Sequence, residues 1–492
     1  MARAPDPPVL MRSRLRLTIL LALAVTAALP TAASASSRQY AIFQDDDQLL
    51  QRGDAVRDRT LDELDALGVD VIKAQLFWSR VAPGGRRKPA GFDGADPSQY
   101  PGWGPYDRLV QSAQARGLRV MLALSPPYPG WATKRRGDRA GVDRPNAREF
   151  GRFAQAAALR FPGVDLWTLG NEPNLYKFLY PQSSRSGVPS APHQYREMVR
   201  AAMAGINRAG AGGDTVLFGE LLPIGTKRFG PKRNLRPLLF LREFFCLNSR
   251  LRPYRGRAAR VRKCRGYRRL RGLDGFAYHP YTRAAGPRLR EPDKDDATIR
   301  SLGRVTRLLD TARRRGRIGG GRLSIWNTEF GFQSNPPDRF QVRLSRIPGF
   351  LAESELLLSL NNRRVASYSQ YLMVDTPITG GDTGTFQTGL RFADGRQKRG
   401  VYAAYRLPIL VRLLGPGAVE VRGAARPGGL GAVVQIQQRR GGGGYEDLGG
   451  PVTVRNARGY FRVRFRISRA ASRRYRFLSD GFSSRAATPI VR

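Results

Sequence analysis

Two glutamates that follow apolar segments are the residues of this chain best suited to chemistry. Glu172 comes after the run VDLWTLG in an Asn-Glu-Pro-Asn sequence, and Glu329 comes after RLSIWN in a Thr-Glu-Phe-Gly sequence. A carboxylate that ends an apolar strand costs free energy unless it has partners or a task. Two carboxyl groups flanking a glycosidic bond can cleave it when one is protonated and the other is ionised. The pair therefore predicts glycoside cleavage, although either glutamate alone could be a helix cap or an ion-pair partner.

Three neighbouring residues have side chains that suit such a site. Asn171, directly before Glu172, could hydrogen-bond a sugar hydroxyl next to the scissile carbon. His279 ends the apolar run LDGFAYH, Tyr281 follows two residues later, and we expect both near Glu329. A tyrosine hydroxyl that donates to Glu329 would lower the pKa of this carboxyl and orient it.

Apolar runs alternate with helical patterns, and this order determines where the candidate residues would lie. The expected strands are residues 39–44, 69–78, 118–125, 164–170, 215–221, 273–279, 322–330 and 365–374. The expected helices are residues 60–67, 106–116, 146–161, 193–209, 298–315, 354–360 and 400–413. Near-continuous apolar strands are typical of a parallel sheet covered by helices, and eight such units predict a (β/α)8 TIM barrel. An open doubly wound sheet is the alternative, but no GxGxxG follows the first strand.

The motifs around the two glutamates carry a family resemblance. LGNEPN, NTEFG and the YHPY between them resemble the clan A glycoside hydrolases, which are retaining (β/α)8 enzymes, and family 39 or family 5 above all. The resemblance covers roughly residues 39–413. It implies that Glu172 is the general acid/base and Glu329 the nucleophile. It also implies that Asn171 binds the 2-hydroxyl, that His279 and Tyr281 line the nucleophile's side, and that no metal or organic cofactor is required.

Several residues match or depart from the family at positions expected to contact sugar. Trp78, in FWSRVAP, looks like the opening cleft wall with its ring facing the sugar. Lys73 stands where the family has an Arg in contact with the nucleophile, and it supplies the charge without the guanidinium fork. Tyr371 stands near the position of the family's Trp platform, and Trp131, in PPYPGWA, is expected on an exposed loop as a further platform. Weaker candidate platforms are Tyr128, Tyr176 and Phe332.

A long insertion, residues 222–272, separates the fifth and sixth expected strands. Between residues 232 and 272 it holds 15 Lys and Arg and one acidic residue, Glu243. It also holds Cys246 and Cys264, which we expect to form a disulfide outside the cytoplasm, two free thiols being the alternative. Two interpretations stay open for the basic insertion, a solvated surface loop or an anion-binding lip beside the cleft.

The two ends of the chain differ from the barrel region. Residues 1–35 have the three parts of a secretory signal, with cleavage before Ser36, and a membrane anchor is the alternative. The signal suits a start at Met11 better than at Met1, and we expect the mature protein to be secreted. Residues 36–416 would form the barrel. Residues 417–492 contain short alternating runs and predict a small antiparallel β-sandwich. These runs are residues 418–423, 432–439, 452–456, 460–467 and 473–479.

Composition limits the remaining classes of function. The 492 residues include 84 Lys and Arg against 39 Asp and Glu, for a formal net charge of +45. The hydrophobic share of 41% fits a folded chain, and two Cys with two His exclude a four-cysteine zinc site. We expect a carbohydrate substrate, an anionic cell-envelope polymer as a possible partner, and no specific nucleic acid. The alternatives are a non-catalytic glycan-binding barrel and a cationic protein that binds the cell envelope or nucleic acid.

Overall fold

The computed structural model describes Met1 and residues 39–134, 140–282, 284–289, 291, 293–339, 341–378 and 385–491. The expected signal segment, residues 1–35, lies outside the described residues apart from Met1. Within the described part of the chain, no helix has the length and apolar character needed to cross a membrane.

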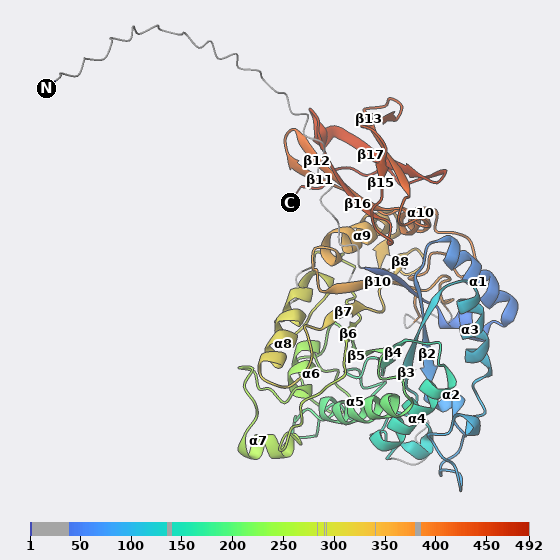
Figure 1. Cartoon of the computed structure of the whole chain (residues 1–492), viewed down its shortest axis with the longest axis vertical. Helices are drawn as coiled ribbons and strands as arrows, with labels where there is room; N and C mark the ends of the chain where they lie inside the picture. The colour runs from blue at the N-terminus through green and yellow to red at the C-terminus, as the bar shows by residue number, and fades with distance from the viewer. Residues whose placement is uncertain are drawn as a thin grey trace.

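Eight parallel strands close into a barrel in the order β1-β10-β7-β6-β5-β4-β3-β2. The strands are β1 (Tyr40–Gln44), β2 (Val71–Phe77), β3 (Arg119–Ser125), β4 (Leu166–Leu169), β5 (Thr215–Leu221), β6 (Gly275–Tyr278), β7 (Ser324–Asn327) and β10 (Val365–Tyr371). Each lies within or close to a run expected to be a strand, so the predicted TIM barrel is confirmed. Figure 1 shows the helices arranged around this barrel.

The helices between the strands cover the outside of the barrel. They are α1 (Asp54–Ala66), α2 (Trp78–Val81), α3 (Gly104–Ala115), α4 (Ala147–Arg160), α5 (Ala191–Arg208), α8 (Leu302–Arg314), α9 (Ile347–Glu353) and α10 (Arg399–Arg406). Asn146 caps α4 because its side chain accepts hydrogen bonds from the backbone N–H groups of Arg148 and Glu149. Buried apolar residues fill the layer between these helices and the strands.

Side chains alternate across each strand, and this alternation determines which residues face the barrel interior. A compact inner cluster takes one buried residue from each of seven strands, among them Val71 on β2, Leu166 on β4 and Ala277 on β6. Two positions further along these strands, Lys73, Thr168 and His279 also face inward. The barrel interior therefore changes from apolar to charged toward the carboxyl ends of the strands.

The C-terminal part forms antiparallel sheets with a core of their own. One sheet has the order β11-β12-β16, with β11 (Ile409–Gly415), β12 (Ala418–Ala424) and β16 (Tyr460–Arg466). The other contains β13 (Val433–Arg440), β14 (Glu446–Asp447), β15 (Val452–Thr453), β17 (Arg473–Ser479) and β18 (Phe482–Ser483). A β-sandwich after the barrel is thus confirmed. The helix expected over residues 400–413 is wrong in its second half, since α10 ends at Arg406 and Pro408 leads into β11.

A buried ion pair joins the sandwich to the barrel, where α9 continues into the π-helix η6 (Ser354–Ser359). Arg426, beyond β12, is paired with Glu355 of η6, and both side chains are almost fully buried. The Tyr460 hydroxyl donates to the same carboxylate at 2.7 Å. Figure 1 shows the sandwich lying against this side of the barrel, beside α9 and α10.

The insertion between β5 and β6 carries two helices that sequence analysis did not predict, α6 (Pro237–Phe244) and α7 (Gly256–Val261). Cys246 and Cys264 form the expected disulfide, which links the end of α6 to the segment after α7. In Figure 1, α7 lies on the opposite side of the barrel from the sandwich.

Candidate active site

Glu172 and Glu329 come together at the carboxyl ends of the barrel strands. Each residue is 8% exposed. One oxygen of each carboxylate and one ring nitrogen of His279 all lie within 4.8 Å of one another. The Glu172 backbone is left-handed, with φ of 38°, and its N–H donates to the Glu220 carbonyl at 2.9 Å. The turn after β4 therefore fixes the position of Glu172 against the end of β5.

Two tyrosines lie beside Glu329. The Tyr281 hydroxyl donates to Glu329 Oε1 at 3.1 Å, and its ring stacks on Phe330. Burial and then the Glu329 charge raise the pKa of Tyr281 and of Tyr371 well above their usual value. Both hydroxyls therefore stay protonated and able to donate near neutral pH. Tyr371 is partly exposed, and its ring meets Phe386 edge-on at 5.4 Å between centroids.

His279 lies among three carboxylates. Its Nδ1 is 3.1 Å from Glu172 Oε1 and 3.9 Å from Glu329 Oε2, and its Nε2 is 2.6 Å from Glu220 Oε2. Sequence analysis placed His279 near Glu329, but its hydrogen bonds join it to Glu172 and Glu220. Burial alone would lower the pKa of His279, yet the charges of Glu329 and Glu220 outweigh burial and raise the pKa to about 9. The imidazole is therefore a cation near neutral pH.

Glu220 is a third buried glutamate that sequence analysis missed. A bulge between Gly219 and Leu221, with φ of 50° at Glu220, brings its side chain to the barrel interior. Its carboxylate accepts hydrogen bonds from Lys73 Nζ at 2.6 Å and Thr168 Oγ1 at 2.9 Å. Burial raises the pKa of Glu220, but the charges and hydrogen bonds of Lys73 and His279 reverse this effect and lower the pKa to about 2. The signal in the sequence is an acidic residue inside an otherwise apolar strand.

The two candidate catalytic glutamates have unlike surroundings. Burial raises the pKa of Glu172 and outweighs the opposing effect of His279. Burial thus favours the protonated form of Glu172, whereas Glu329 accepts a hydrogen bond from Tyr281. This arrangement can supply an acid and an anion to the same bond.

Asn171 is held by residues at the ends of the first three strands. Gln75 Nε2 donates to Asn171 Oδ1 at 3.2 Å, while Ser125 donates to the other end of the Gln75 amide. The Gln75 backbone N–H donates to Asp46 Oδ1 at 2.7 Å. Burial raises the pKa of Asp46, a partly exposed acid beside the site that sequence analysis did not single out.

Three residues predicted to contact sugar are buried in the structure. Trp78 is fully buried between the strands and helices, stacked on Phe153 at 5.2 Å between ring centroids. Trp131 is also buried, and its indole N–H donates to the Pro83 carbonyl at 2.9 Å, so PPYPGWA is not an exposed loop. Lys73 is fully buried and paired with Glu220.

The three weaker candidate platforms differ in their exposure to solvent. Tyr128 and Phe332 are buried among other aromatic rings and face no solvent. Tyr176 is partly exposed. Of the aromatic residues singled out from the sequence, Tyr281 and Tyr371 lie beside the two glutamates.

The cluster of Glu172, His279 and Glu329 has a spacing that could hold a metal ion. A histidine ligand, however, binds a metal through the lone pair of a neutral imidazole. Both ring nitrogens of His279 already lie within hydrogen-bond distance of carboxylates, Nδ1 of Glu172 and Nε2 of Glu220. A metal bound through Nδ1 would replace the contact with Glu172.

Comparisons with known proteins leave the family open. No protein-family model matches this chain, and no curated protein matches it. A solved structure named glycoside hydrolase superposes on 91% of this chain and 96% of its own, with a TM-score of 0.44 and 9% identity. At that TM-score and identity, the superposition does not assign an activity to this chain.

Proposed function

We propose that this protein is a retaining glycoside hydrolase that cleaves O-glycosidic bonds of an oligo- or polysaccharide. The observation that carries the proposal is the close approach of Glu172 and Glu329, since one carboxylate oxygen of each lies within 4.8 Å of the other at the carboxyl ends of the strands. Retaining enzymes hold their two carboxyl groups about 5–5.5 Å apart, and inverting enzymes hold them about 6.5–9.5 Å apart to admit a water. The short separation supports retention.

In the first step Glu329 attacks the anomeric carbon, and a glycosyl–Glu329 ester forms as the bond to the leaving oxygen breaks. Glu172 gives its proton to that oxygen. The rise in the pKa of Glu172 caused by burial favours this proton donation. The Tyr281 hydroxyl, 3.1 Å from Glu329 Oε1, orients the nucleophile.

In the second step Glu172, now a carboxylate, takes a proton from water. The resulting hydroxide attacks the anomeric carbon, the ester bond breaks, and Glu329 is restored with retention at the sugar. Asn171, fixed by Gln75, is placed to hold a substrate hydroxyl through both steps. No step needs a metal or an organic cofactor.

The proposal is tested by screening the protein against aryl β-glycosides and polysaccharides, with released phenol or reducing ends as the readout. We expect turnover of at least one substrate and its loss in Glu329→Ala. Glu446→Ala, which removes an exposed glutamate of β14, is the matched control and should keep full activity. Near-normal turnover by Glu329→Ala would refute the assignment.

A further inference from the structure

A cavity of about 550 Å³ lies among the connections that follow β3, β4 and β5, at the carboxyl ends of the strands. Its walls come from the β3–α4 connection at Arg144, the β4–α5 connection at residues 181–190, α5, and the insertion at residues 261–263. Neither Glu172 nor Glu329 lines it. Glu172 and the 181–190 wall belong to the same connection between β4 and α5.

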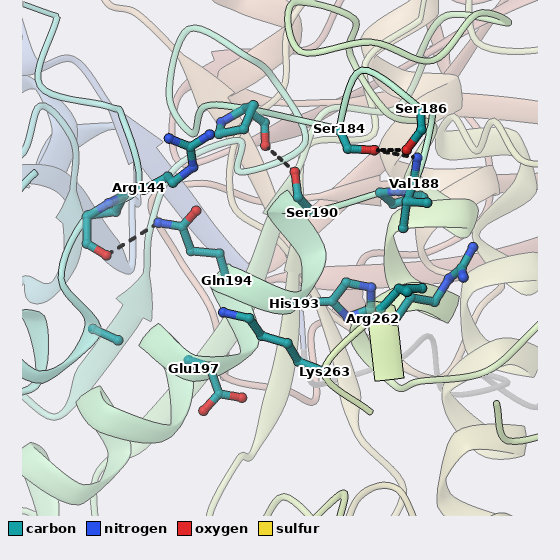
Figure 2. Close-up of a pocket in the computed structure, with 15 residues that line it drawn as sticks. Arg144, Ser184, Ser186, Val188, Ser190, His193, Gln194, Glu197, Arg262 and Lys263 are labelled. Carbon is teal, nitrogen blue, oxygen red and sulfur yellow. Dashed lines mark hydrogen bonds between the residues drawn. The ribbon is translucent and has the colours of Figure 1, made fainter. Parts of the chain in front are cut away.

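The cavity has an excess of positive charge. Arg144 lies on one side, Arg262 on the other, and Lys263 between them (Figure 2). The acidic residue of the lining, Glu197, lies 3.5 Å from Arg196 and 3.7 Å from Arg200, two arginines that do not line the cavity. Its charge is thus compensated from outside. Arg144 lies 3.4 Å from Asp143, which does not line the cavity, and its guanidinium has further N–H groups for a ligand.

The wall that carries Arg262 and Lys263 is fixed in place. Glu243 accepts hydrogen bonds from Arg262 at 3.1 Å and Tyr254 at 2.6 Å, and it lies 3.1 Å from the buried His193. Arg196 of α5 donates to the Lys263 carbonyl at 3.0 Å. The disulfide at Cys264 adds a covalent restraint. A wall already ordered in this way loses little conformational entropy when a ligand binds.

The rest of the lining suits a saccharide. Pro145, Pro181, Val188 and Val261 give the cavity apolar surface for the C–H faces of sugar rings. Serine hydroxyls lie on the same wall, where Ser184 and Ser186 are 2.9 Å apart (Figure 2). Apolar walls with a few polar groups that fix orientation are typical of small-ligand sites.

We propose that this cavity binds a carboxylate-bearing sugar unit, a uronic acid, of the polysaccharide that the active site cleaves. That the bound sugar belongs to a cleaved polysaccharide rests on the proposed function. That the ligand is an anionic sugar rests on the lining of the cavity. Arg144 and Lys263 would pair with the sugar carboxylate by charge-assisted hydrogen bonds. Arg262 has a structural role as well, since it is bonded to Glu243.

The test measures binding rather than turnover, in a chain made inactive by Glu329→Gln. The probes are a hexamer of galacturonic acid and its methyl ester, which share one backbone and differ in charge. In calorimetry we expect the acid to bind, and Arg144→Ala with Lys263→Ala to weaken its affinity by about tenfold or more. The matched control, Arg466→Ala with Arg474→Ala, removes two exposed arginines of the sandwich and should change the affinity by less than about twofold.

Three results would overturn the inference: no binding of the acid, equal affinity for acid and ester, or unchanged affinity in the Arg144 and Lys263 variant. Failure of the proposed function is separate, because it is decided by hydrolysis of aryl glycosides. Hydrolysis without binding of the acid would refute only the uronic-acid site. Binding that depends on the cavity, without hydrolysis of any glycoside, would refute only the glycosidase.

Discussion

Glu220 sets the balance of charge beneath the candidate active site. It is fully buried and accepts hydrogen bonds from Lys73 and Thr168, and its carboxylate lies 2.6 Å from His279 Nε2. Without Glu220, Lys73 and His279 would lose the carboxylate that lies nearest to each of them. Glu220 thus lets the site keep a positive His279 between the two candidate catalytic carboxyls.

Removing the Glu220 charge alone should be costly. We expect Glu220→Gln to lower the free energy of unfolding by about 3–5 kcal/mol, because Lys73 is left buried without its partner. Removing both charges, in Lys73→Met with Glu220→Gln, should cost less than the single Glu220 variant. Denaturant unfolding of the three proteins measures this. A double variant as unstable as the sum of the two single variants would show that the pair is not coupled.

His279 makes stability depend on pH in a defined direction. Its pKa in the folded protein is about 9, above the usual 6.5, so the folded state holds the proton more tightly. The stabilisation is complete below about pH 6.5 and is lost as the pH rises to about 9, with a slope of at most about 1.4 kcal/mol per pH unit. Unfolding of the unsubstituted protein and of His279→Gln across this range measures the difference. Parallel curves would contradict the raised pKa.

The sequence indicated Glu172 and Glu329 because each follows an apolar strand, where a carboxylate is conspicuous. Glu220 was not identified from the sequence because its side chain reaches the barrel interior through a bulge in β5, where Glu220 itself has a left-handed backbone. The regular alternation of side chains along a strand does not predict such a bulge. Trp78 was predicted to face the sugar, but its side chain is buried. β2 ends at Phe77 and Trp78 begins α2, so its ring packs in the layer under the helices.

At the scale of elements, the eight barrel strands were predictable because buried parallel strands are long apolar runs. β11 was not predictable, because its sequence ILVRLL continues an apolar pattern that starts in α10. Both helices and strands can bury such a run. The helices of the insertion are short, eight residues in α6 and six in α7, and so show little helical periodicity in the sequence. Figure 1 shows α6 between α5 and α8, and α7 beyond one end of α5.

The disulfide should contribute most of the insertion's resistance to unfolding. It closes a loop with a sequence separation of 18, for which the chain-entropy model gives about 3 kcal/mol. We expect Cys246→Ser with Cys264→Ser to lower the unfolding free energy by about this amount in denaturant titrations. The same titration of the unsubstituted protein in reductant is the control. Coincident curves for the variant and the oxidised protein would refute the contribution.

At the scale of the whole molecule, the barrel and the sandwich share a buried interface. Glu355 pairs with Arg426 there, next to a cluster that includes Leu356, Leu410 and Tyr460. The sandwich therefore packs on the outer layer of the barrel through η6. Arg458 of the sandwich contacts Asp70 and Tyr40 at the amino ends of β2 and β1, whereas Glu172 and Glu329 lie at the carboxyl ends of the strands.

The ion pair between Glu355 and Arg426 should couple the stability of the two parts. We expect Glu355→Gln to cost about 3 kcal/mol or more, because Arg426 is left buried without an anion. Calorimetric unfolding provides the measurement. Glu446→Gln, at an exposed position of the sandwich, should change stability by no more than about 0.5 kcal/mol. Equal effects of the two substitutions would contradict the role of the interface.

The most direct test of the two-glutamate account is to trap the covalent intermediate. A 2-deoxy-2-fluoro aryl glycoside of the sugar found in the screen slows the second step more than it slows the first. We predict that the protein gains the mass of one fluorosugar and that peptide mapping places it on Glu329, with no label in Glu329→Gln. A label on any other residue, or an active enzyme that never forms a covalent adduct, would contradict the account.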